Sequence, residues 1–196
     1  VRYIMLRSTI EGHAKIGLAE DVTAAVLERK RIEHERDHDI LTGLYNRQAF
    51  NRVCTELFAA PERMGVAALM MMDLDNLKHI NDTYGHTEGD NAISTVGKAL
   101  MTSAIQGEVC SRFGGDEFTV AGVIADMDDN YFESFRERFR EYLRQYNQIS
   151  RKHYLVESSI GFCFQKLEDE IDLDQMIKIA DDRMYEDKVQ RRKARR

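Results

Sequence analysis

Two glycines followed by two carboxylates stand near the middle of the chain, where residues 112–118 read R-F-G-G-D-E-F. Apolar residues on both sides predict a hairpin over 109–124 that carries paired negative charge at its tip. Gly114 and Gly115 permit positive φ and leave no Cβ to obstruct a ligand. Because Asp116 and Glu117 repel each other unless a cation offsets the repulsion, the stretch predicts a metal site. Taken by itself, this tetrapeptide also suits a solvated turn.

A second set of carboxylates follows an apolar strand. The run 66–72 is apolar without interruption, which predicts a buried strand, and Asp73-Leu74-Asp75 comes directly after it. Carboxylates at the end of a strand stand where active sites commonly form. Asp73 is therefore a candidate partner for the hairpin carboxylates.

The order of elements predicts the fold that brings these segments together. A βαββαβ core predicts the α+β class and a ferredoxin-like antiparallel sheet covered on one side by helices. In that topology the end of the first core strand lies beside the central hairpin, so Asp73 can meet Asp116 and Glu117. The expected elements are a helix over 48–60 ended by Pro61, the strand 66–72, a helix to about 83 broken by Gly85, a helix over 89–103, the hairpin 109–124, a helix over 131–146, a strand over 156–164 and a helix over 174–188.

The first 38 residues differ from the rest. Two extended runs around 11–13 predict a hairpin, and residues 23–37 predict a charged helix whose thin apolar stripe suits pairing with another copy, although a solvated helix fits equally well. The segment from Gly17 to Thr23 resembles the end of a PAS sensory domain passing into its exit helix. Because the chain opens on Val1 inside an apparent strand, we expect a piece of a longer protein.

One short pattern in this helix points elsewhere. Residues 34–38 read H-E-R-D-H, which matches the His-Glu-x-x-His pattern of zinc proteases and puts both imidazoles on one helical face. The flanks are charged, and no third ligand stands out downstream. We therefore set the zinc interpretation aside.

Composition narrows the function classes. The formal net charge of -6 argues against a general binder of nucleic-acid polymers. Three scattered cysteines without Cys-x-x-Cys spacing predict free thiols in a reducing compartment, hence a cytoplasmic location, although the full-length protein could be tethered to a membrane. The longest apolar run is too short to span a bilayer, so we expect no membrane segment in this stretch.

Several separated motifs together resemble the GGDEF domain family, the diguanylate cyclases, over about 37–192. These motifs are 39–47 (D-I-L-T-G-L-Y-N-R), 73–78, Asn81-Asp82 with Gly85-His86 and Gly89-Asp90, 112–118, 159–161, and Ala180-Asp181 through Tyr185 and Lys188. The resemblance implies a nucleotidyl-cyclase-like fold and the condensation of two GTP into cyclic di-GMP with release of two pyrophosphates. It also implies Mg²⁺ or Mn²⁺, two ions per active site during catalysis. The implied domains are a sensory remnant over 1–22, a linker helix over 23–38, the catalytic domain over 39–192 and a basic tail over 193–196.

The resemblance also assigns roles to residues. Asp73, the Leu74 carbonyl and Glu117 hold metal, and Asp116 acts as a metal ligand or as a base on the 3′-hydroxyl; the roles of Asp116 and Glu117 stay open. Asn81 and Asp90 bind guanine, although both residues could instead cap helices and turns locally. The remaining substrate contacts are His86, Gly114, Gly115, Lys78, Lys188 and Arg192.

Three departures from the family pattern matter. Leu77 replaces the usual Phe, which is a tolerable apolar exchange. The product-inhibition site falls at 105–108, where Ile105 lacks the required guanidinium, so we expect no feedback inhibition there. Residues 191–193 read R-R-K where the family usually shows Gly-Arg-Asn, which makes the role of Arg192 less secure.

Two functions remain in competition. One domain binds one GTP, so an active cyclase needs a homodimer with two sites face to face, aligned through the linker by an upstream sensory domain. The alternative is a catalytically silent module with the same fold that binds GTP or cyclic di-GMP as a sensor or scaffold.

Overall fold

The computed structural model describes residues 1–11, 14–59, 65–104, 107–125, 129–167 and 170–194. They divide into two compact units, Val1–Asp37 and His38–Arg196. No helix in these ranges is both long and apolar enough to cross a bilayer.

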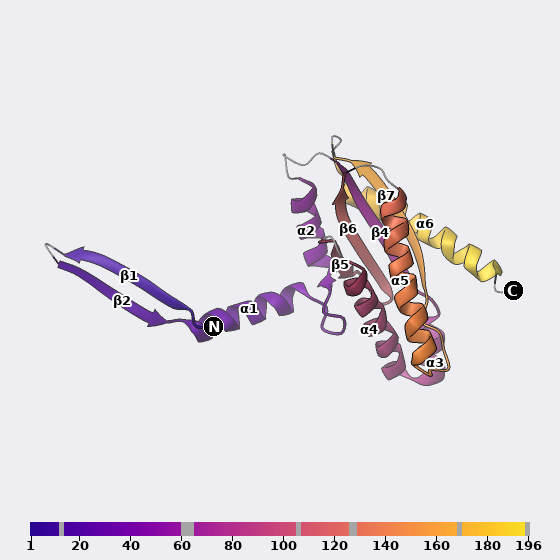
Figure 1. Cartoon of the computed structure of the whole chain (residues 1–196), viewed down its shortest axis with the longest axis horizontal. Coiled ribbons are helices and arrows are strands. Elements are labelled where there is room, and N and C mark those ends of the chain that lie inside the picture. The colour runs from indigo at the N-terminus through magenta and orange to yellow at the C-terminus, as the bar shows by residue number, and fades with distance from the viewer. Residues whose placement is uncertain (12–13, 60–64, 105–106, 126–128, 168–169, 195–196) are drawn as a thin grey trace. The chain divides into compact units, whose positions relative to one another are not determined.

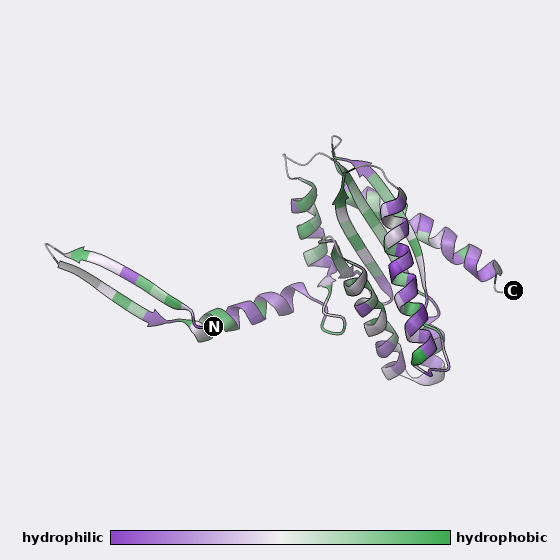
Figure 2. Ribbon diagram, viewed as in Figure 1, coloured by the Kyte–Doolittle hydropathy of each residue, from purple (hydrophilic) through white to green (hydrophobic). Residues whose placement is uncertain are grey.

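The first unit consists of a hairpin and a helix. Strands β1 (Ile4–Glu11) and β2 (Ala14–Asp21) pair antiparallel, and helix α1 (Thr23–Asp37) follows, which confirms both expected elements. The helix buries no residue, and Leu27 and Ile32 are each 53% exposed. Its surface is dominated by hydrophilic residues (Figure 2). Leu27 and Ile32 are therefore left exposed by their own unit.

The two histidines of the zinc-like pattern do not share a helix. His34 lies on α1, but the helix ends at Asp37, and His38 stacks on Tyr45 in the second unit with ring centroids 4.8 Å apart. The expectation that both imidazoles stand on one helical face is wrong. The early end of the helix removes the geometry that a zinc site would need.

The second unit is built on a five-stranded sheet in the order β3-β5-β6-β4-β7. The strands are β3 (Tyr45–Asn46), β4 (Val66–Leu74), β5 (Val109–Arg112), β6 (Glu117–Ile124) and β7 (Ser158–Lys166). β4 pairs antiparallel with both β6 and β7, and β5 pairs antiparallel with β6. This confirms the βαββαβ core. The two residues of β3 add an unexpected parallel pairing with β5, which makes the sheet mixed.

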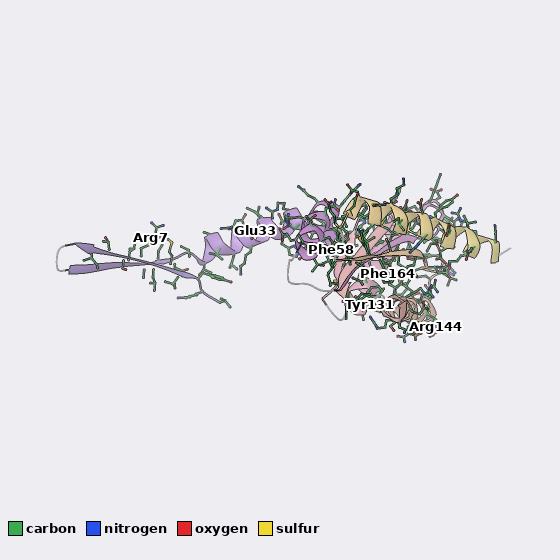
Figure 3. All side chains as sticks on the ribbon, turned by 90° about the horizontal axis from the view of Figure 1, so that it is seen from above. Arg7, Glu33, Phe58, Tyr131, Arg144 and Phe164 are labelled. Atoms are coloured by element: carbon green, nitrogen blue, oxygen red, sulfur yellow. The ribbon has the colours of Figure 1, made fainter. Side chains whose placement is uncertain are left out.

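Helices cover both faces of this sheet, so the expected one-sided cover is wrong. Helices α4 (His86–Ser103) and α5 (Asp129–Ile149) pack on one face, and α2 (Arg47–Phe58) and α6 (Leu173–Ala194) pack on the other. Figure 3 shows α5, which carries Tyr131 and Arg144, and α6 on opposite sides of the sheet. The physical reason is β4, all nine of whose residues are buried. A strand that is apolar on both faces needs a layer on each side.

Several helix boundaries also differ from expectation. Helix α3 (Leu77–Tyr84) ends before Gly85, as expected, and the φ of 88° at Gly85 suits glycine, but α4 begins at His86 instead of Gly89. Helix α6 continues to Ala194, so Arg191, Arg192 and Lys193 are helical (Figure 1). Helix α2 ends at Phe58, and Pro61, which was expected to end it, lies outside the described residues.

Candidate active site

Strand pairing brings the predicted carboxylates together at one end of the sheet. Asp73 on β4 stands directly opposite Glu117 on β6 in the antiparallel register. The backbone N–H of Leu74 donates to the carbonyl of Asp116 at 2.8 Å. Residues 42 and 44 positions apart in sequence thus meet at one place, as the predicted topology requires.

The turn between β5 and β6 is closed by its own backbone and by one arginine. The N–H of Phe113 donates to the Glu117 carbonyl at 2.8 Å, and Nη2 of Arg112 donates to the Gly115 carbonyl at 2.8 Å. Nη1 of Arg112 also reaches Oδ2 of Asp39 at 3.1 Å. The segment that begins at Asp39 therefore holds the hairpin tip in place.

Neither glycine of the turn adopts a positive φ, so what matters at both positions is the absence of a side chain. A Cβ on Gly114 would stand 3.0 Å from Oε2 of Glu117, so this glycine leaves room for the carboxylate. A Cβ on Gly115 would meet nothing within 4 Å, and the residue is exposed. The expectation of positive φ is wrong, while the expectation of backbone open to a ligand fits Gly115.

Negative charge is concentrated and only partly neutralised at this edge. Burial raises the pKa of Asp73, Lys188 opposes that rise, and the nearby Asp116 and Asp75 add to it. Burial also raises the pKa of Glu117. The negative charges of Asp116, Asp181 and Asp73 raise it further. A cation placed here would relieve both the repulsion and the desolvation.

The carboxylate and carbonyl oxygens of this site suit a hard divalent cation, although they are not already arranged around a metal position. Carboxylate and carbonyl oxygens are the ligands that Mg²⁺ prefers. Among the described residues, no three His, Cys, Asp or Glu side chains already stand together as a metal site. Nζ of Lys188 instead lies 2.5 Å from Oδ1 of Asp73. Side chains must therefore rearrange for a metal to bind at Asp73.

The predicted guanine contacts lie where α3 meets α4. Asn81 is partly buried on α3, and its Oδ1 lies only 1.9 Å from where a Cβ on Gly89 would stand. Asp90 follows Gly89 directly and is exposed. The structure thus places the Asn81 amide against Gly89, the residue before Asp90. His86 at the start of α4, Lys78 on α3 and Arg192 on α6 are also exposed and accessible to a ligand.

A loop between α5 and β7 holds these two helices. Nζ of Lys152 donates to both carboxylate oxygens of Glu88, at 2.7 and 2.9 Å, and the Tyr154 hydroxyl donates to the same carboxylate at 2.7 Å. The Tyr84 hydroxyl donates to the His153 carbonyl at 3.0 Å. The loop therefore fixes the junction that carries Asn81 and Asp90.

Sequence reasoning missed the role of Asp75. This carboxylate is buried, accepts a hydrogen bond from Oγ of Ser159 at 2.8 Å, and lies 3.8 Å from Nη1 of Arg191. Both Asp75 and Ser159 belong to the motifs noted above. Their contact, across 84 positions, was not visible in either motif.

Helix α6 is attached along the outer edge of β7, beyond which the described part of the chain places no further strand. Nη1 of Arg183 donates to the Phe162 carbonyl at 2.6 Å, the Ile160 N–H donates to Oδ2 of Asp187 at 3.0 Å, and Arg191 donates to the Ser158 carbonyl. These α6 residues recur every four positions and satisfy alternate residues of the free edge. The spacing fixes the register of α6 and with it the position of Lys188.

Comparison with known proteins agrees with this geometry. Residues 36–194 match the family described as "Diguanylate cyclase, GGDEF domain". Diguanylate cyclase DgcP of Escherichia coli is 35% identical over 157 residues, which cover 79% of this chain and 45% of that protein. Diguanylate cyclase DgcM of Escherichia coli is 32% identical over 106 residues, 53% of this chain and 25% of that protein. The chain thus spans less than half the length of these relatives.

Solved structures show the same fold. Diguanylate cyclase SiaD of Pseudomonas aeruginosa, solved in complex with its activator SiaC, superposes with a TM-score of 0.70 at 23% identity over 85% of this chain and 67% of that one. The coiled coil and GGDEF domain of DgcB from Caulobacter crescentus, solved with c-di-GMP, gives a TM-score of 0.67 at 24% identity over 84% and 90%. With the family match covering nearly all of the second unit, the chain belongs to the GGDEF domain family of diguanylate cyclases.

Proposed function

We propose that this domain is an active diguanylate cyclase that condenses two GTP into cyclic di-GMP and releases two pyrophosphates. In each half-reaction the ribose 3′-hydroxyl of one GTP attacks the α-phosphate of the other, a new P–O bond forms, and pyrophosphate leaves. The supporting observation is the pairing of Asp73 with Glu117 beside Asp116, which assembles the carboxylates that such a displacement requires.

The acidic residues of the site would bind metal, and the basic residues would bind the triphosphate. Asp73, the Leu74 carbonyl and Glu117 would hold Mg²⁺ or Mn²⁺, two ions per site during catalysis, and Asp116 serves as a further ligand or as base on the 3′-hydroxyl. Bound metal supplies activation of the nucleophile and neutralisation of the leaving group. The backbone at Gly114 and Gly115, which is open to a ligand at Gly115, receives the triphosphate. The cationic side chains of Lys78, Lys188 and Arg192 neutralise its charge.

Guanine is selected at the junction of α3 and α4. Asp90 accepts hydrogen bonds from N1–H and N2–H of the base, and the Asn81 amide, with His86 nearby, meets the remaining edge. Adenine presents no matching pair of donors.

The remaining proposals concern assembly. Each domain carries one site, so catalysis requires a homodimer, and residues 23–38 act as the linker that aligns two copies of the domain 39–192. The exposed Leu27 and Ile32 of α1 support this role. We assign residues 1–22 to an upstream PAS-like domain and 193–196 to a basic tail. Free thiols and the need for GTP favour the cytoplasm.

The first test is a protein concentration series with GTP and Mg²⁺, with products resolved by mass. Because two sites must meet, we expect cyclic di-GMP per protein to rise with protein concentration. Constant specific activity from a stable monomer would contradict the dimeric mechanism. Bound GTP without product at any concentration would instead favour the silent sensor or scaffold.

A prediction for guanine binding follows from Gly89. In Gly89→Ala the new Cβ would overlap the Asn81 side chain, which must turn away from its position. We expect the Kd for GTP to rise about tenfold through loss of one hydrogen bond to the base. Isothermal titration with a non-hydrolysable GTP analogue measures it.

The matched control is Asn81→Ala, with and without Gly89→Ala. If Gly89 acts through Asn81, the double variant binds no more weakly than Asn81→Ala. If the losses of GTP-binding free energy in the two single variants add up in the double variant, Gly89 contributes to binding independently of Asn81.

A further inference from the structure

The Asp73 carboxylate is costly to bury and has one cationic partner. Its side chain is 12% exposed, and among the described residues Lys188 is the one cation within ion-pair distance, at 2.5 Å. Asp116 and Asp75 add like charge to the same place. When ionised, a buried carboxylate in such surroundings needs a cation beside it.

Lys188 can supply that cation because its backbone is fixed while its ammonium is not. The neighbouring Asp187 accepts from the Ile160 N–H, which anchors this turn of α6 to β7. The Lys188 side chain is 21% exposed and ends in a flexible four-carbon stem. Its ammonium can therefore leave Asp73 without any movement of the helix.

We propose that Lys188 is an exchangeable counter-ion that occupies the Asp73 carboxylate before metal binds. This inference rests on the proposed function, because it concerns the same metal site. A divalent ion and an ammonium compete for the same carboxylate, since two cations so close repel. Metal entry releases Lys188 toward solvent, where an anionic phosphate receives it.

The exchange couples the two ligands. Metal without phosphate must displace an ion pair and leaves Lys188 without a partner, so metal binds weakly in the absence of nucleotide. Phosphate draws Lys188 away and so frees Asp73 for metal. Each ligand therefore favours binding of the other, by the same factor in both directions.

The test measures Mn²⁺ binding without nucleotide, by electron paramagnetic resonance of free Mn²⁺, and not turnover. We expect Lys188→Met to bind Mn²⁺ about tenfold more tightly than the unsubstituted protein, because the competing ammonium is gone. The matched control is Lys178→Met, which removes an exposed lysine from the same helix and should leave the Mn²⁺ affinity unchanged. Equal affinity in Lys188→Met and the unsubstituted protein overturns the proposal.

A second measurement uses the unsubstituted protein and so does not depend on the variant folding. We expect acetylation of Lys188 by acetic anhydride, followed by mass spectrometry, to be slow in metal-free protein and to accelerate when Mn²⁺ is added. Acetylation that Mn²⁺ leaves unchanged, while Mn²⁺ is bound, overturns the exchange but leaves the metal site intact. Failure of both lysine variants and the unsubstituted protein to bind Mn²⁺ overturns the proposed metal site together with the exchange.

Discussion

Glu117→Gln is expected to reduce cyclic di-GMP formation about a thousandfold or more while the domain remains folded. Glutamine keeps the size of the side chain and removes the negative charge that would hold a metal opposite Asp73. The loss should appear in product resolved by mass at saturating GTP and Mg²⁺.

The stability of the metal-free Glu117→Gln variant, in contrast to its activity, should not fall. Burial and the neighbouring Asp116 raise the pKa of Glu117, so the fold disfavours its ionised form, and at neutral pH the charged side chain destabilises the metal-free domain. We therefore expect the Tm of Glu117→Gln without metal to equal or exceed that of the unsubstituted protein.

The matched control is Glu186→Gln, which neutralises an exposed carboxylate on α6. It should change neither turnover nor Tm. Undiminished turnover in Glu117→Gln would remove Glu117 from the site, and a large fall in its Tm would show a structural role instead.

Local sequence signals predicted most elements, and the exceptions depend on contacts distant in sequence. The apolar run 66–72 identified β4 correctly. The same run lacks alternation, which signals burial on both faces, and the one-sided cover we expected overlooked that signal. The two residues of β3 are too few to show the alternation of apolar and polar residues that identifies a strand. They form a strand because Tyr45 and Asn46 pair with Ser111 and Arg112.

The candidate site shows the same contrast between local sequence signals and contacts that are distant in sequence. Motifs identified Asp73, Asp116 and Glu117, because strand ends and turns concentrate polar residues where the topology brings them together. The ion pair of Lys188 with Asp73 joins residues 115 positions apart, and no local pattern could predict it. Helix α6 extends past Lys188 for a similar reason. Arg191 contacts Ser158 and Glu157 on the neighbouring segment and so favours helix beyond the predicted end.

Gly161→Ala is expected to cause the largest loss of stability, about 3 to 5 kcal/mol, because the added methyl has no space. A Cβ on Gly161 would stand 2.1 Å from the carbonyl oxygen of Ala180 and 2.1 Å from the backbone nitrogen of Met184. Both atoms belong to the α6 backbone, so no side chain can rotate to relieve the clash. Urea denaturation followed by circular dichroism measures the change.

The consequence reaches the active site because α6 carries Lys188. If Gly161→Ala moves the helix away from β7, the ion pair of Lys188 with Asp73 must weaken as well. The same movement would take Lys188 from the position proposed to contact phosphate, so whatever fraction remains folded should bind GTP poorly. Gly115→Ala is the control for stability, since its Cβ would meet nothing within 4 Å and its free energy of unfolding should stay within about 0.5 kcal/mol. Equal stability of the two variants would mean that α6 does not depend on Gly161 for its approach to the sheet.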